Sequence, residues 1–170
     1  MAGCRRCHGQ GPFWGAKVGP NPTDRGKPGT KKSLLVEGRS GPLGAVIAGA
    51  NVHDAKLLRA TIEAIVVKRP RPTARRRQHL CLDKGYDNPS GREAAKAGGY
   101  VPHIRRIGEE KLDPKGRKRY PARRWVVERT LGWLSKCRAL LVRYDKKDTN
   151  YLGLLQLGCA LLWFRRMLRI

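Results

Sequence analysis

The chain has 170 residues, with 37 Lys or Arg against 13 Asp or Glu, so its formal charge is +24. This length suits a single domain with one core, and such an excess of cations favours a polyanionic partner, nucleic acid before any other. The longest apolar stretch, residues 152–164, is too short to span a membrane. The first twenty residues lack the apolar block of a secretory signal. We therefore expect a cytoplasmic, nucleoid-associated protein with no membrane partner.

The sequence of residues 1–18 is the hardest part of the chain to interpret. Cys4, Cys7 and His8 have the spacing of a c-type haem attachment site and offer three zinc ligands. Covalent haem requires export and an axial partner, and a structural zinc site requires a fourth ligand, which no nearby Cys/His pair supplies. We expect residues 1–18 to be disordered or misread, and residues 19–170 to form the folded domain.

Two short strands are predicted after a stiff loop. Residues 19–30 combine Pro and Gly in a pattern that opposes both a helix and a central strand. Residues 33–37 and 42–48 are mainly apolar, and the four residues between them, 38–41, are typical of a hairpin turn. The sheet therefore begins antiparallel. Asp54 follows as the expected N-cap of a helix with apolar residues at helical spacing.

A strongly basic segment lies between this helix and the next strand. Residues 68–77 hold six cations and two prolines. One interpretation is a solvated surface loop, but a flexible cationic loop also gains affinity for phosphate by releasing counterions without a precise fit. We expect contacts with DNA from Lys68, Arg69, Arg71, Arg75, Arg76 and Arg77.

An acid ends the next predicted strand. Residues 80–82 are a short apolar run followed by Asp83 and a glycine two positions later, which indicates a buried strand whose carboxyl end presents Asp83. Acids that handle ligands occupy this place in open α/β sheets. A helix over 89–98 and a strand over 100–104 follow, and Pro102 confines that strand to a sheet edge or to its own end.

Residues 120–138 are predicted to form a helix after a proline, with a buried stripe at steps of four and three. Glu128 lies off this stripe, with Arg124 one turn before it and Arg129 beside it. In isolation the arrangement indicates a solvated ion pair. A last helix over 151–169 is apolar on most sides and is expected to pack on the sheet. The predicted stripe consists of Val126, Thr130, Trp133, Cys137 and Leu140.

Together, Asp83 and Glu128 indicate a cation site. An Asp at a strand end and a Glu on a helix 45 positions later can converge on one divalent cation. Hard cations such as Mg²⁺ prefer carboxylate oxygen and retain several waters, and two such ions about 4 Å apart support phosphodiester displacement. The two carboxylates are therefore the candidate catalytic and metal-binding residues.

Three separated motifs point to a family. They are Gly-Pro-Asn-Pro-Thr-Asp-Arg-Gly-Lys at 19–27, Leu-Asp-Lys-Gly-Tyr-Asp at 82–87 and Arg-Arg-Trp-Val-Val-Glu-Arg-Thr at 123–130. In this order they resemble bacterial insertion-sequence transposases of the DDE type, whose catalytic domain is RNase H-like. The resemblance covers nearly all of the chain from Gly19 onwards. It implies an α/β fold with a mixed sheet and flanking helices.

The resemblance also implies an activity. Asp83 would be the second metal-binding acid of the family and Glu128 the third, with Mg²⁺ or Mn²⁺ as cofactor. The reaction would be cleavage of a phosphodiester at an element end, followed by attack of the freed 3′-hydroxyl on target DNA. Double-stranded DNA would be the partner of an oligomer, and Arg124 and Arg129 would neutralise nearby phosphates.

The first acid of this pattern is missing. In RNase H-like nucleases it lies on the first strand, whereas this chain has no Asp or Glu before Asp24. Asp24 is expected in a loop, Glu37 at a strand end and Asp54 at a helix start, so none has the required setting. We expect a first strand that is missing or altered, and little activity from this chain alone. It would be a fragment of a split or frameshifted transposase with an upstream polypeptide, or a decayed copy. The alternative is a non-catalytic, basic nucleic-acid-binding protein.

Overall fold

The computed structural model describes residues 2–10, 15–104 and 124–168, and for residues 2–10 and 124 it describes only the course of the backbone. In chain order the elements are β1 (Ala2–Gln10), β2 (Gly19–Pro20), β3 (Pro28–Val36), β4 (Pro42–Gly49), α1 (Asp54–Glu63), β5 (Gln78–Leu82), the 3-10 turn η1 (Lys84–Tyr86), α2 (Pro89–Ala97), β6 (Tyr100–Ile104), α3 (Arg124–Ser135), α4 (Arg138–Leu141) and α5 (Asp148–Met167).

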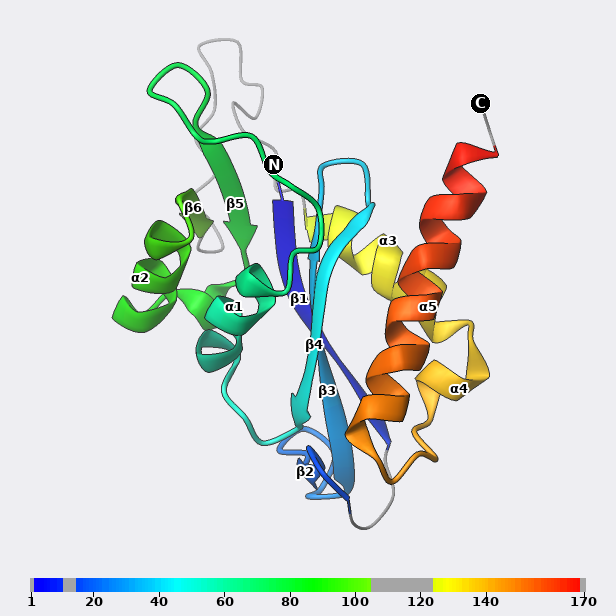
Figure 1. The fold of residues 1–170 in the computed structure, drawn as a ribbon. Helices are drawn as coiled ribbons and strands as arrows, with labels where there is room; N and C mark the ends of the chain where they lie inside the picture. The colour runs from blue at the N-terminus through cyan, green and yellow to red at the C-terminus, as the bar shows by residue number, and fades with distance from the viewer. Residues whose placement is uncertain (1, 11–14, 105–123, 169–170) are drawn as a thin grey trace, which may run out of the picture.

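The strands form one mixed sheet with β1 at its centre (Figure 1). β1 is antiparallel to β3 and parallel to β5. β4 is antiparallel to β3 and β6 is parallel to β5, so the order across the sheet is β4-β3-β1-β5-β6. The short β2 pairs with the first residues of β3. The predicted α/β class, with an antiparallel beginning, is confirmed.

The N-terminal segment differs from its expected state. Residues 2–10 form the central strand, so this segment is ordered and the first strand is not missing. Their sequence has two glycines, two arginines and a histidine, and it lacks both the alternating and the continuous apolar pattern of a strand. The strand forms because β3 and β5 offer backbone partners on both sides, and this context outweighs local preference.

Apolar side chains fill two cores, one on each face of the sheet. α1 and α2 cover the first face, and α3, α4 and α5 cover the second (Figure 1). Because successive strand residues point to opposite faces, Leu35 enters the first core while Leu34 and Val36 enter the second. The first core contains Leu35, Leu58, Ile62, Leu80, Leu82, Tyr86, Ala95 and Tyr100. The second contains Leu34, Val36, Ile47, Val126, Val127, Leu131, Leu134, Leu140, Tyr151 and Leu155.

Several predicted elements are confirmed, with two local differences. The hairpin is formed by β3 and β4, and β5, α2 and β6 lie where predicted, with β6 at an edge of the described sheet. However, β3 begins at Pro28, inside the segment expected to be a loop. The N-cap of α1 is His53 and not Asp54, because His53 Nδ1 accepts the N–H of Ala55 at 3.3 Å.

The helix predicted over 120–138 is described from Arg124 and ends early, at Ser135. The chain then turns and continues as α4, with Cys137 as its N-cap. The predicted stripe is therefore wrong at Cys137, which lies beyond the end of α3 and is exposed. It is also wrong at Trp133, which lies within α3 but is only half-buried. The residues of α3 that are buried are Val126, Val127, Thr130, Leu131 and Leu134.

The last predicted helix is α5, but only one side of it packs on the sheet. Tyr151 and Leu155 are fully buried, whereas Leu157, Leu161 and Phe164 keep at least half of their surface exposed. The expectation that this helix packs on the sheet is confirmed. Of the helices in the described ranges, none combines the length and the apolar character needed to cross a bilayer.

The cysteines give a test of this fold. Burial raises the pKa of the Cys159 thiol on α5 to about 11, so about one molecule in a thousand carries the reactive thiolate at pH 8. Cys137 is exposed. At pH 8 iodoacetamide is expected to label Cys137 well before Cys159, as followed by peptide mass mapping. Unfolding in urea should make the two rates similar; equal rates in the native chain would contradict the packing of α5.

Candidate active site

β5 delivers Asp83 to the end of a buried strand. Asp83 stays extended (φ −75°, ψ 162°), and its Oδ1 accepts the N–H of Lys84 at 2.8 Å, which begins the η1 turn. Leu80 and Leu82 both enter the core beneath α1 and α2. Because side chains alternate along a strand, Asp83 belongs to the opposite face, the one that α3 covers.

α3 presents Glu128 on its outer side. Val126 and Val127 are buried beneath this helix, whereas Glu128 and Arg129 are exposed. Both candidate acids therefore come from the same side of the sheet. In the part of the chain that the structure describes, no three His, Cys, Asp or Glu side chains gather as potential metal ligands.

The register of β1 shows which central position is next to Asp83. Cys4 pairs with Leu82 of β5. One residue further along, Arg5 pairs with Leu34 of β3, while β5 runs on to Asp83. Leu34 belongs to the core beneath α3. Position 5 therefore lies in the same row as Asp83, on the central strand, and it holds an arginine.

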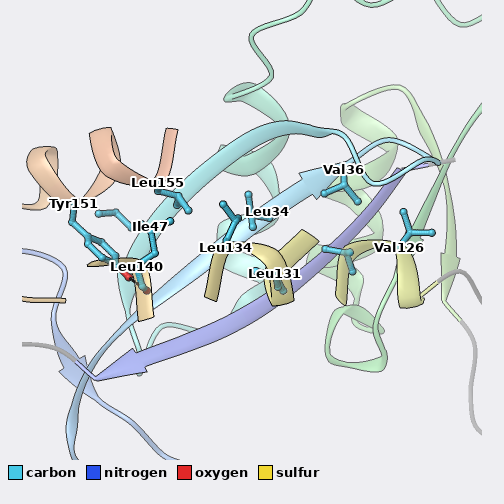
Figure 2. Packing of buried hydrophobic residues seen from close by; sticks show 10 residues of the cluster. Leu34, Val36, Ile47, Val126, Leu131, Leu134, Leu140, Tyr151 and Leu155 are labelled. Atoms are coloured by element: carbon cyan, nitrogen blue, oxygen red, sulfur yellow. Dashed lines mark hydrogen bonds between the residues drawn. The ribbon is translucent and has the colours of Figure 1, made fainter. Parts of the chain in front are cut away.

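Figure 2 shows how α3 lies against β3. Val126 lies at the Val36 end of β3, and Leu134 lies further towards the middle of that strand. Gly3 pairs with Val36, so the first half of α3 lies at the end of the sheet where β1 begins. Glu128, two residues after Val126, is on this half of the helix.

Comparison with known proteins identifies the family. Residues 4–163 match the family described as Transposase DDE domain. The chain belongs to this family. It is 36% identical over 160 residues to the putative transposase for insertion sequence element IS402 of Burkholderia cepacia, a match that covers 92% of this chain and 73% of that protein. The resemblance to insertion-sequence DDE transposases is thus confirmed, and the family match begins within β1.

A buried ion pair of this transposase domain was missed by sequence reasoning. Lys31 Nζ on β3 lies 2.9 Å from Asp54 Oδ1 at the start of α1, with side chains 3% and 6% exposed. Lys31 also donates to the Val52 carbonyl. A Cβ added to Gly85 would lie 3.6 Å from Asp54 Oδ2, so the pair packs against the turn that follows Asp83. The available signal was a lysine just before the predicted strand over 33–37, a residue type that requires an internal partner when it is buried.

The predicted DNA-binding loop of the transposase domain lies away from Asp83. It precedes β5 whereas Asp83 follows it (Figure 1), and five strand residues span about 17 Å. Arg69 is held internally: it donates to Gln78 Oε1 at 3.1 Å and to the Gly98 carbonyl at 2.9 Å, and it stacks on the Tyr100 ring at 4.4 Å. The exposed cations of the loop are Lys68, Arg71, Arg75, Arg76 and Arg77.

Two arginines were predicted beside Glu128, and the structure describes the side chain of one of them, Arg129. Arg129 is exposed, and its guanidinium stacks on the Trp125 ring at 4.4 Å from the centroid. The side chain of Arg124 lies outside the described part of the chain. Stacking uses a face of the guanidinium and not the in-plane N–H groups that bind phosphate, so Arg129 can still contact a phosphate one residue from the candidate acid.

The Lys31–Asp54 pair gives a stability prediction. Asp54→Leu would leave Lys31 buried without this partner, and breaking a buried pair costs about 3–5 kcal/mol. Urea unfolding should show this loss, and the double variant Lys31→Met/Asp54→Leu should recover most of it. Glu63→Gln is the matched control, because its pair with Arg59 has the same 2.9 Å distance but is exposed, so the loss should stay below about 1 kcal/mol. Equal losses at both sites would contradict the burial of Asp54.

Proposed function

We propose that this DDE transposase domain has an RNase H-like catalytic arrangement, in which Asp83 and Glu128 act together in phosphodiester chemistry on DNA. The observation that supports this proposal is that both acids come from the same side of the sheet and flank the central strand. The sheet order, with an antiparallel half and a parallel half joined at β1, supports the same proposal.

The donor set suits a hard divalent cation. Asp83 and Glu128 offer carboxylate oxygens, which Mg²⁺ and Mn²⁺ prefer. When bound, such a cation would neutralise charge on the phosphate and favour its attack by a nucleophile. The contribution of the chain is to hold Asp83 through the Lys84 N–H and to carry Glu128 on a helix that is anchored by its buried face.

The substrate that this function implies is double-stranded DNA. A phosphodiester at an element end would be hydrolysed first, and the freed 3′-hydroxyl would then attack a phosphodiester of the target. Arg129, beside Glu128, would neutralise phosphate near the acids, and the exposed cations of the 68–77 loop would hold the duplex further away. The protein would act on DNA as an oligomer, because two element ends have to be joined.

Arg5 is the reason to propose little activity for this chain alone. The central position beside Asp83 should carry a carboxylate to complete the cation site, but the sequence has an arginine at this position, a residue type that cannot ligate a metal cation. The chain would then be a fragment that depends on an upstream polypeptide, or a decayed copy. Reading the other frames of the gene across and upstream of codons 1–10 distinguishes these cases, because a split gene retains a frame with an acid-bearing strand.

Arg5→Asp is expected to create metal binding. Calorimetry should show an Mn²⁺ affinity at least about tenfold above that of the original chain, or 1.4 kcal/mol, together with Mn²⁺-dependent nicking of plasmid DNA. Arg6→Asp is the matched control, because it makes the same change of charge one position along, at the residue that pairs with Ser33.

Adding Asp83→Asn to Arg5→Asp should abolish the gain. Asn keeps an Oδ1 acceptor for the Lys84 N–H, so the turn is preserved while the charge is removed. An equal response to Arg5→Asp and Arg6→Asp, or a gain that survives Asp83→Asn, would remove Asp83 and position 5 from the site. Nicking by the original chain would contradict its proposed inactivity.

A non-catalytic nucleic-acid binder is the second candidate, and Arg5 at the central position favours it. Both functions need the basic loop. Replacing Arg75, Arg76 and Arg77 with Gln is expected to reduce the slope of log affinity against log salt by about 2–3, at about 0.9 per phosphate contact. Fluorescence anisotropy with duplex DNA measures this slope. The same replacement of Lys56, Arg59 and Lys96 on α1 and α2 should change it little; if the two triple variants behave alike, the loop is not the interface. Duplex binding that persists while Arg5→Asp creates no metal site would favour the binder.

A further inference from the structure

We propose that His79 of β5 and His103 of β6 form a binding site for a divalent transition metal of the Ni²⁺ or Cu²⁺ type. Nδ1 of His79 lies 2.7 Å from Nε2 of His103, and the two ring centroids are 4.9 Å apart. Neither histidine belongs to the site residues predicted from the sequence, and the proposed function uses neither of them. The inference therefore stands apart from the proposed function.

The parallel half of the sheet brings the two histidines together. β5 and β6 lie side by side (Figure 1), and the register pairs His79 with Val101, two residues before His103. Residues two apart along a strand share a face, so the histidines are diagonal neighbours on one face of the sheet. Leu80 points to the other face, into the core beneath α1 and α2. Both histidines are half-buried, which leaves them within reach of a small ion from solvent.

Two neutral imidazole rings at this distance share one proton. One ring donates its N–H and the other accepts it, so the accepting nitrogen directs its lone pair into the contact. When the shared proton moves through water to the outer nitrogen of its own ring, both lone pairs point to the same spot. Two lone pairs that converge in this way are the arrangement of two metal ligands, and no proton has to leave the pair to create it.

The distance between the two nitrogens selects the geometry of the metal. Metal–nitrogen bonds of about 2.0 Å place two ligands about 2.8 Å apart at the right angle of a tetragonal centre, but about 3.3 Å apart at a tetrahedral angle. The observed 2.7 Å matches the right angle. Nitrogen ligands in tetragonal or square-planar geometry are typical of Ni²⁺ and Cu²⁺, whereas structural Zn²⁺ is tetrahedral.

The histidine pair and the candidate acids would bind different ions. Imidazole nitrogen suits the later transition metals, and carboxylate oxygen suits Mg²⁺ and Mn²⁺. Asp83 follows His79 by four residues, about 13 Å along a strand, so one ion cannot contact both. Over the described ranges no cluster of three potential ligands is present, so Cys81, the neighbour of His103 in the register, is not a third ligand. Water would fill the remaining positions.

A metal at this pair would join two strands of the sheet. β6 is an edge of the described sheet and pairs there with β5 alone. The two ligands are 24 positions apart in the chain, so they come together only when the sheet is formed. An ion that binds the folded chain better than the unfolded chain stabilises the fold. The ion would therefore act as a clamp between β6 and the strand that leads to Asp83.

The test is a calorimetric titration of the full chain, without a histidine tag, with Ni²⁺ at pH 8. Ni²⁺ is the probe because Cu²⁺ oxidises thiols and the chain has five cysteines. His79→Gln and His103→Gln should each lower the Ni²⁺ affinity at least about tenfold, because a single imidazole lacks the gain of two linked ligands. An excess of Mg²⁺ should not displace Ni²⁺, so this site and the acid site can fail separately.

The chain has four histidines, and the other two provide the matched controls. His8→Gln makes the same change on β1. His53→Asn retains an acceptor for the Ala55 N–H at the start of α1. Neither change should weaken Ni²⁺ binding. If binding is lost in His8→Gln and kept in His103→Gln, the ion belongs to the N-terminal segment and the proposal is overturned.

Two measurements on the original chain need no variant. Ni²⁺ should raise the midpoint of urea unfolding, because the pair exists only in the folded chain. It should also protect His79 and His103, but not His53, from diethyl pyrocarbonate, as read by peptide mass mapping. An unchanged midpoint, or equal modification of the pair with and without Ni²⁺, would show that the contact is a hydrogen bond between strands and nothing more.

Discussion

The register of β1 is the constraint on which the rest of the structure depends. This strand is the only connection, within the described sheet, between the antiparallel half (β3 and β4) and the parallel half (β5 and β6). It is held by eight paired positions with β3, from Gly3 to Gln10, but by only three with β5, from Ala2 to Cys4. A shift of one residue against β5 would exchange the face that position 5 belongs to. The relation between the central strand and Asp83 therefore rests on a short parallel ladder.

β3 shows how a strand that is buried on both faces accommodates cations. Lys31 and Lys32 point to opposite faces, and each ends on a polar partner at the limit of a core: Lys31 on Asp54, and Lys32 on the Leu140 carbonyl at 2.7 Å. A buried ammonium without such contacts would be neutralised or would unfold the strand. The two lysines thus fix α1 on one face and α4 on the other. Their ion pair and hydrogen bond are directional, whereas apolar packing alone would leave the positions of the two helices adjustable.

The sequence predicted those elements whose signal is local. The hairpin turn, the apolar run before Asp83, the helix beginning at Pro89 and the edge position of Pro102 each depend on residues within a few positions. It did not predict β1, whose arginines and glycines are placed by two neighbouring strands, nor the end of α3 at Ser135, which follows from packing. Asp83 and Glu128 could be proposed from motif and spacing. That they share one side of the sheet could be seen only in the structure, from the burial of Leu82 on the opposite face and the alternation of side chains along β5. Lys31 and Asp54 are far apart in the chain, so no local pattern could show which residue Lys31 pairs with.

One helix, α3, carries the candidate acid and the arginine proposed to contact phosphate. Glu128 and Arg129 are consecutive on α3, and Trp133 follows one turn after Arg129, so they move together if the helix moves. What holds α3 in place is its buried face, from Val126 to Leu134, together with the bond from Thr130 to the hairpin. The acid, Arg129 and Trp133 are therefore positioned by the same packing, and the rise of about 1.5 Å per helical residue fixes the spacing of their backbone positions along the helix.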